Sequence, residues 1–188
     1  MAPIEAAEYQ RIIDFLKALD NKLNKRALLY LIGGGAITLA YAPENRTADI
    51  DVIDVNEEIT RLGGIESKLA KEFGVYISPL FDITFSAPSG WRSRCRLLEL
   101  DLQKLGIRVA DPYDITLGKL ARLEPKDIED ILSLTEAGQI EIDRLLERLN
   151  DNLIEVNKFP HYRQNALLLF GDILKQPIVF KHGQARFV

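Results

Sequence analysis

Two aspartates, Asp49 and Asp51, have the type and spacing that suggest chemistry most directly. They lie in the run from Ala48 to Val55, which alternates as a β-strand does. Residues two apart on a strand point to the same side of the sheet, so both carboxylates reach one place. Two like charges this close destabilise each other unless a cation lies between them. Mg²⁺ prefers hard oxygen ligands, so the pair predicts a magnesium site; the alternative is an exposed strand end or a turn cap.

A glycine triplet, Gly33-Gly34-Gly35, precedes the aspartates and separates a short apolar run from a helical pattern. Glycine lets the backbone approach a phosphate closely, and the N-terminus of the following helix offers N–H groups and the positive end of its dipole. A tight turn without a ligand is the alternative, and the triplet alone favours it. It is no dinucleotide fingerprint, because Thr38 stands where the third glycine is needed, and no Walker A lysine follows. The triplet gains weight from the aspartates downstream.

Basic residues offer two further phosphate contacts. Arg46 directly precedes Thr47 and the aspartate pair, and it is the better single candidate. The stretch from Trp91 to Leu102 reads as a long strand, which would place Arg92, Arg94 and Arg96 on one face. Such a face would hold a nucleic-acid backbone or a triphosphate, or it would form a charged edge strand that resists aggregation.

The remaining elements must position these groups. Periodicity predicts helices over 3–23, 34–41, 56–73 with a break at the Gly63-Gly64 pair, 112–123, 125–135, 140–150 and 160–174. It predicts strands over 27–32, 48–55, 91–102 and 106–110, one or two short strands within 75–86, and an irregular tail or short strand over 177–188. This order indicates an α/β or α+β core over residues 1–111 and a helical C-terminal portion over 112–188.

Composition excludes several classes of protein. The 188 residues carry a net charge of −4, which argues against broad nonspecific binding of nucleic acid. The single cysteine, Cys95, allows no intrachain disulfide, and two histidines far apart in sequence make a His/Cys zinc site improbable. No run reaches the length of a membrane span, so we expect a cytoplasmic protein that does not bind membranes.

The chain resembles a known superfamily. A strand ending in Gly-Gly, a helix, and Asp-hydrophobic-Asp on the next strand is similar to the signature of polymerase-beta-like nucleotidyltransferases. More closely, IGGGAITLAY, RTADIDVID and DPYDITLGKLARLEPKDIEDI resemble segments of bacterial AbiEii-like nucleotidyltransferases and of a related uncharacterised family. The matching positions, within residues 28–135, are Gly33, Gly34, Thr47, Asp49, Asp51, Lys119, Lys126, Asp127 and Asp130.

The resemblance implies a nucleotidyltransferase fold, a small mixed sheet flanked by helices, with the C-terminal portion completing a cleft. It implies transfer of a nucleotide from an NTP to an acceptor hydroxyl of RNA, tRNA or protein. Asp49 and Asp51 would hold Mg²⁺, and the glycine amides with Thr47 would bind the nucleotide. A role in a toxin–antitoxin pair, with an antitoxin partner, or in phage defence also follows from the likeness.

Three further assignments rest on the resemblance. A third catalytic carboxylate is expected, with Glu99 or Asp101 favoured and Asp82 as the rival. Lys119 would point at the triphosphate; the alternative is a solvated lysine on an amphipathic helix. Asp127 would orient Lys119 or position the acceptor; the alternative for Asp127 and Asp130 is favourable placement of acids in the first turn of a helix. If no third carboxylate reaches Asp49 and Asp51, a catalytically inactive protein that binds nucleotide or a partner protein becomes the alternative.

Overall fold

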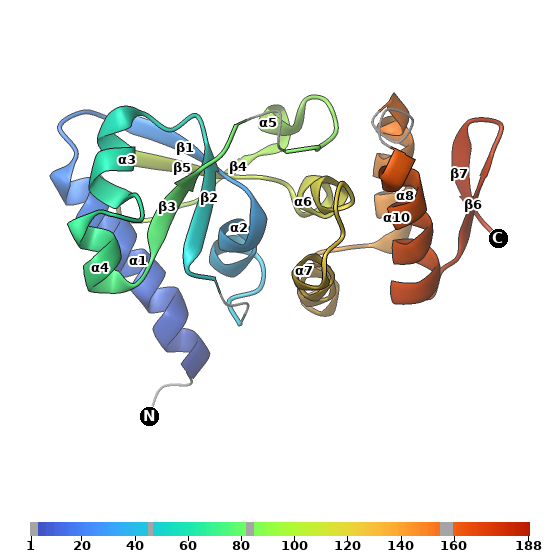
Figure 1. Cartoon of the computed structure of the whole chain (residues 1–188), viewed down its shortest axis with the longest axis horizontal. Helices are drawn as coiled ribbons and strands as arrows, with labels where there is room; N and C mark the ends of the chain where they lie inside the picture. The colour runs from blue at the N-terminus through green and yellow to red at the C-terminus, as the bar shows by residue number, and fades with distance from the viewer. Residues whose placement is uncertain (1–3, 45–46, 82–84, 155–159) are drawn as a thin grey trace. The chain divides into compact units, whose positions relative to one another are not determined.

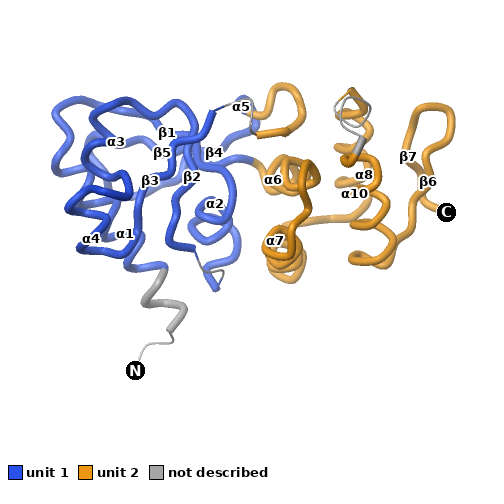
Figure 2. The backbone as a smooth tube through the Cα atoms, in the orientation of Figure 1, with its two compact units in different colours: residues 1–84, 92–110 blue, residues 85–91, 111–188 orange. Residues whose placement is uncertain are grey.

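The computed structural model describes residues 4–44, 47–81, 85–154 and 160–188, and the chain divides into two compact units (Figure 1 and Figure 2). Unit 1 consists of Met1–Thr84 and Arg92–Ala110, and unit 2 of Phe85–Trp91 and Asp111–Val188. The expectation that the C-terminal portion completes a cleft stays a prediction.

Unit 1 is built on a mixed five-stranded sheet with the order β3-β2-β1-β5-β4. Its strands are β1 (Ala27–Leu31), β2 (Asp49–Ile53), β3 (Tyr76–Pro79), β4 (Arg96–Leu97) and β5 (Leu105–Val109). β1 pairs in parallel with β5 and antiparallel with β2, β2 pairs in parallel with β3, and β4 pairs antiparallel with β5. The predicted class, a small mixed sheet flanked by helices, is confirmed.

Helices cover one face of the β2–β3 pair. The helices of unit 1 are α1 (Ile4–Lys22), α2 (Gly33–Ala40), α3 (Glu57–Gly63) and α4 (Lys68–Phe73). Ile50 and Ile77, opposite each other in the β2–β3 ladder, are buried on this face. The backbone of α2 at Gly35 comes so close that a Cβ there would lie 3.2 Å from the Cα of Ile50. A Cβ at Gly63 of α3 would lie 3.1 Å from Cγ1 of the Ile77 side chain. The opposite face of the two strands is therefore the one left for polar side chains.

Asp20, near the end of α1, fixes the turn that leads into β5. Its side chain is only 3% exposed and accepts hydrogen bonds from the backbone N–H groups of Gln103, Lys104 and Leu105 at 2.9, 2.7 and 2.6 Å. Burial raises the pKa of Asp20, but these three N–H groups together with the charge of Lys104 outweigh burial, so the pKa lies below its usual value. Asp20 thus ties α1 to the sheet.

The predicted long strand from Trp91 to Leu102 is wrong. The chain forms a short helix, α5 (Trp91–Arg94), and then the two-residue strand β4. Trp91 is buried, and its backbone N–H bonds to the carbonyl of Pro88, closing a turn through Gly90 at φ +77°. Turn geometry and burial of the indole thus override the strand pattern.

The arginines of this stretch accordingly do not line one face. The Arg92 guanidinium pairs with Asp54 at 3.0 Å and lies 5.6 Å from the centre of the Tyr30 ring. Arg96 instead lies over the Tyr41 ring at 4.6 Å and donates to the Ala40 carbonyl. The predicted three-arginine surface is not formed.

Unit 2 is mostly helical. Its elements are α6 (Pro112–Lys119), α7 (Pro125–Glu136), α8 (Ile142–Asp151), α10 (Pro160–Leu168), the π-helix η2 (Leu169–Ile173), and the strands β6 (Ile178–Lys181) and β7 (Gln184–Phe187). The last two form an antiparallel hairpin, and the Asn150 side chain holds it through both backbone groups of Ala185. Within the described ranges, no helix is long and apolar enough to cross a membrane.

Candidate functional site

Asp49 and Asp51 lie on β2 beside the point where β1 turns into α2. The backbone N–H of Ile32, the residue before Gly33, bonds to the carbonyl of Asp51 at 3.0 Å and extends the β1–β2 ladder. Ile50 and Val52 are fully buried, whereas both aspartates are half-buried. The predicted alternation of β2 is confirmed for its first four residues: both carboxylates lie on the face opposite to Ile50 and Val52, and Ile53, which shares their face, is buried.

Gly33 makes room for the carboxylate of Asp51. A Cβ on Gly33 would lie only 2.6 Å from Asp51 Oδ2, closer than real side chains allow. Gly33 also has φ +64°, a left-handed conformation that other residues adopt only at a cost. The missing side chain and the left-handed backbone both require glycine at position 33. With glycine there, the first turn of α2 can lie against Asp51 of β2.

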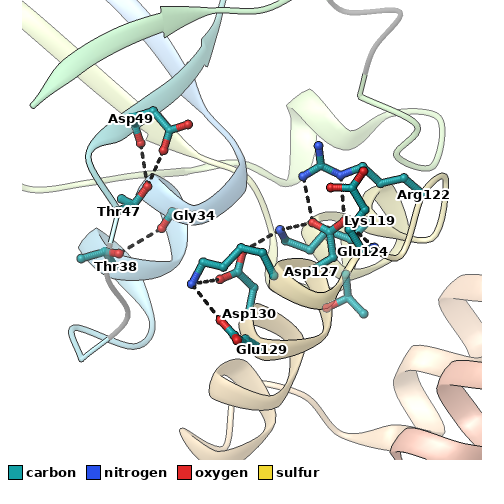
Figure 3. A network of polar contacts seen from close by, with 12 residues as sticks. Gly34, Thr38, Thr47, Asp49, Lys119, Arg122, Glu124, Asp127, Glu129 and Asp130 are labelled. Atoms are coloured by element: carbon teal, nitrogen blue, oxygen red, sulfur yellow. Dashed lines mark hydrogen bonds and ion pairs between the residues drawn. The ribbon is translucent and has the colours of Figure 1, made fainter.

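The N-terminus of α2 is suited to bind an anion. The helix starts at Gly33 after the N-cap residue Ile32, whose apolar side chain makes no capping hydrogen bond. The hydroxyl of Thr38 donates to the carbonyl of Gly34 at 3.0 Å inside the helix, so this threonine, which replaces a fingerprint glycine, is occupied locally (Figure 3). Backbone N–H groups and the helix dipole favour a negatively charged ligand at this end.

Thr47 orients the first aspartate. Its hydroxyl lies 2.6 Å from Asp49 Oδ1 and 3.0 Å from the Asp49 carbonyl oxygen (Figure 3). A hydroxyl that donates to a carboxylate fixes its rotamer and leaves its other oxygen to a ligand. Thr47 therefore acts on Asp49 in this structure, while its predicted contact with nucleotide stays a prediction. The other phosphate candidate, Arg46, lies outside the described residues.

β3 adds two hydroxyl groups beside the aspartates. In the parallel ladder Tyr76 lies opposite Asp49, and Ser78 lies opposite Asp51. Burial, followed by the charges of Asp49 and Asp51, raises the pKa of Tyr76. Sequence reasoning missed both residues, although their spacing of two in a short strand was a usable signal.

The expected third carboxylate is not among the groups brought together here. Glu99 and Asp101 are exposed and follow β4, which lies three strands from β2, or about 14 Å at the usual strand spacing. Asp82 lies outside the described residues. In the parts of the chain that the structure describes, no three His, Cys, Asp or Glu side chains form a group that could hold a metal ion.

The aspartate pair nevertheless suits Mg²⁺. Mg²⁺ is commonly held by one or two carboxylates together with substrate phosphates and water, rather than by a complete protein cage. Asp49 and Asp51 offer hard oxygens on one face, and the space that a Cβ at Gly33 would fill lies directly against Asp51 Oδ2. The donor set therefore fits the ion.

Unit 2 contains a buried ion-pair network around Lys119, at the end of α6 (Figure 3). The Lys119 ammonium donates to Asp127 Oδ1 at 2.9 Å and to Asp130 Oδ2 at 2.7 Å, and its side chain is 10% exposed. Two of its three N–H donors thus hold α6 to α7. Asp127 and Asp130 hold the Lys119 ammonium in place, while the predicted roles of Lys119 and Asp127 toward a triphosphate or an acceptor stay predictions.

Asp127 collects further donors at the start of α7. Arg122 donates to both of its carboxylate oxygens, at 2.7 and 3.0 Å, and the backbone N–H of Glu124 bonds to it at 3.1 Å. Burial raises the pKa of Asp127, but the hydrogen bonds from Arg122 and Lys119 outweigh burial and hold it below its usual value. Asp127 is therefore a buried, charged anchor of this corner.

A second cluster of carboxylates, Asp111 and Asp114, lies at the other end of α6. Asp114 is fully buried and accepts from Arg148 of α8 at 2.8 Å, while the N-cap residue Asp111 accepts from the backbone N–H of Tyr113. Burial and the neighbouring charge of Asp114 raise the pKa of Asp111. An aspartate followed by proline favours a helix cap at Asp111, whereas the pairing of Asp114 with Arg148 joins residues 34 apart in sequence and has no local signal.

Comparison with known protein families gives a match over most of the chain. The model of a family described as nucleotidyltransferase of unknown function (DUF6036) matches residues 7–173. No curated protein matches the chain. Among solved structures, the chain is similar to an antigenic nucleotidyltransferase-like protein from Paracoccidioides brasiliensis, with 17% identity, coverage of 87% of this chain and 94% of that one, and a TM-score of 0.42.

Proposed function

The chain belongs to the family of nucleotidyltransferases of unknown function (DUF6036), and from this membership we propose that it transfers a nucleotide from an NTP to an acceptor hydroxyl. The observation that carries the proposal is the contact between Gly33 and Asp51. It brings a helix N-terminus, which favours phosphate, to a pair of carboxylates, which favour a divalent cation. A metal-bound triphosphate carries both the negative charge that the helix N-terminus favours and the divalent cation that the carboxylates favour.

Each group of the site has a part in this reaction. Asp49 and Asp51 hold Mg²⁺, and Thr47 fixes the rotamer of Asp49. When bound, Mg²⁺ offsets the negative charge of the phosphates. The amides at Gly33-Gly34-Gly35 bind phosphate oxygens. The acceptor oxygen attacks the α-phosphorus in line, the bond to pyrophosphate breaks, and the hydroxyl proton passes to solvent or a base.

Finer parts of the proposal rest on the likeness to AbiEii-like proteins. Lys119 contacts the triphosphate, held in its rotamer by Asp127 and Asp130. Arg46 is a further phosphate contact. Glu99 remains the candidate for a third carboxylate, and it would have to reach the site from its place after β4, three strands from β2. The acceptor is RNA, such as tRNA, or protein, and the biological role is in a toxin–antitoxin pair with an antitoxin partner or in phage defence.

The test is incubation with each α-labelled NTP, Mg²⁺ and total tRNA or cell protein, followed by a gel that separates labelled RNA from labelled protein. Asp49→Asn keeps the size of the side chain and removes the charge, so we expect labelling to fall to background. Asp143→Asn, at an exposed position of α8, is the matched control and should label as the wild type does. Equal labelling by Asp49→Asn and the wild type would overturn the mechanism.

A second candidate is a catalytically inactive protein that binds nucleotide or a partner. The observation in its favour is that the described residues contain no third carboxylate beside Asp49 and Asp51. It predicts that the wild type binds Mg²⁺ and NTP with no labelled product for any base or acceptor. Labelled product that depends on Asp49 would exclude it.

A further inference from the structure

The strand β3 presents side chains to the same face as the two aspartates. Directly opposed residues of parallel strands point to the same side of a sheet, and the ladder pairs Asp49 with Tyr76 and Asp51 with Ser78. Ile77, between the two hydroxyl residues, is 1% exposed and lies on the helix-covered face. Tyr76 and Ser78 are half-buried, as the aspartates are. One face therefore carries two carboxylates and two hydroxyls in adjacent positions.

These hydroxyls have no hydrogen-bond partner among the described residues, in contrast to the Thr47 hydroxyl, which donates to Asp49. A hydroxyl is neutral and can donate a hydrogen bond, whereas an ionised carboxylate is negatively charged and can only accept one. Phosphate oxygens need donors, and the charge on a bound triphosphate makes each such bond stronger than a neutral one.

We propose that Tyr76 and Ser78 bind the nucleotide's phosphates, donating hydrogen bonds to the triphosphate whose metal ion Asp49 and Asp51 hold. This inference rests on the proposed function and deepens it. β3 then increases the affinity for substrate through hydrogen-bond donors, and it adds no negative charge to those of Asp49 and Asp51. The site holds triphosphate between the amides of α2 on one side and the hydroxyls of β3 on the other.

The inference predicts that the β3 hydroxyls affect the binding of Mg²⁺ with triphosphate but not the binding of the metal ion alone. Tyr76→Phe and Ser78→Ala should weaken binding of Mg²⁺ with inorganic triphosphate by about tenfold each, as expected for a hydrogen bond to a charged group. Both should leave the affinity for Mn²⁺ alone unchanged, whereas Asp49→Asn should weaken both. Inorganic triphosphate is the probe because it carries no base. Isothermal calorimetry measures the first constant and electron paramagnetic resonance of free Mn²⁺ the second.

Tyr9→Phe, on α1, is the matched loss of a phenol and should bind as the wild type does. Melting curves check that each variant is folded, and the two β3 variants provide independent tests. In the transfer assay, the KM for NTP should rise while kcat stays within about twofold, which a general loss of structure would not produce.

The outcomes separate this inference from the proposed function. If Asp49→Asn loses triphosphate binding while Tyr76→Phe and Ser78→Ala bind as the wild type does, the inference is overturned and the proposed function stands. If the β3 variants also lose affinity for Mn²⁺ alone, the hydroxyls act on the metal and the inference is again overturned. If the wild type binds no Mg²⁺-triphosphate, both are overturned.

Discussion

Replacing Gly33 by alanine perturbs the site at its closest contact. The new Cβ would lie 2.6 Å from Asp51 Oδ2, and real Cβ contacts essentially never fall below 3.0 Å, so the carboxylate or the helix start must move by at least about 0.4 Å. The left-handed backbone at φ +64° adds a conformational cost of about 1–2 kcal/mol. Displacements approaching 1 Å at reacting groups reduce rates by up to about a hundredfold, so we expect a loss of ten- to a hundredfold in transfer.

Gly138 provides the control for this experiment. It has φ +69°, and a Cβ there would meet nothing within 4 Å. Gly138→Ala therefore has the same backbone cost without a neighbour to displace. Urea unfolding should show a loss of about 1–2 kcal/mol for Gly138→Ala and at least as much for Gly33→Ala, while triphosphate binding and transfer fall only in Gly33→Ala. Wild-type binding and transfer by Gly33→Ala would refute the placement of Asp51 at the site.

Two buried aspartates support further predictions. Asp20→Ala leaves three backbone N–H groups before β5 without their acceptor, so the free energy of unfolding in urea should fall by about 2 kcal/mol or more; a change below about 0.5 kcal/mol would contradict this anchoring role. Asp127→Ala breaks a buried pair and leaves Lys119 with one carboxylate partner, so unfolding should become easier by about 3 kcal/mol. Because the folded pKa of Asp127 is lowered, its contribution is fully present above the unfolded value of about 3.9 and is lost as the pH falls through the lower folded value. Melting temperatures from pH 6 to pH 2 should therefore fall less steeply in Asp127→Ala than in the wild type, and parallel curves would refute the assigned shift.

Local patterns carried much of the information in unit 1. The strand, glycine turn, helix and aspartate strand between residues 27 and 53 follow from period-two and period-3.6 spacing together with the glycines, and the structure confirms them. Both acids of β2 were placed on one face by the same spacing. Helix starts at Asp111-Pro112 and at Pro125 followed from proline and capping preferences.

Contacts between distant segments could not be predicted in this way. The position of Tyr76 beside Asp49 depends on which strands pair, and α3 and α4 intervene between them. The three N–H bonds to Asp20 join residues more than 80 apart in sequence. At Trp91, burial of a large side chain and a glycine turn replaced an apparent strand by a short helix. Lys119 resembled a solvated helix residue, and only tertiary structure shows its two carboxylate partners.

The central claim, nucleotidyl transfer at Asp49 and Asp51, is tested most directly by the position of the label that is transferred. Matched reactions would contain NTP labelled at the α- or the γ-phosphate, Mg²⁺, and the acceptor mixture of tRNA and protein. The account predicts that α-label enters an acceptor, that γ-label is released as pyrophosphate, and that Asp49→Asn abolishes the incorporation. Incorporation of γ-label, or of α-label at the wild-type level by Asp49→Asn, would contradict it.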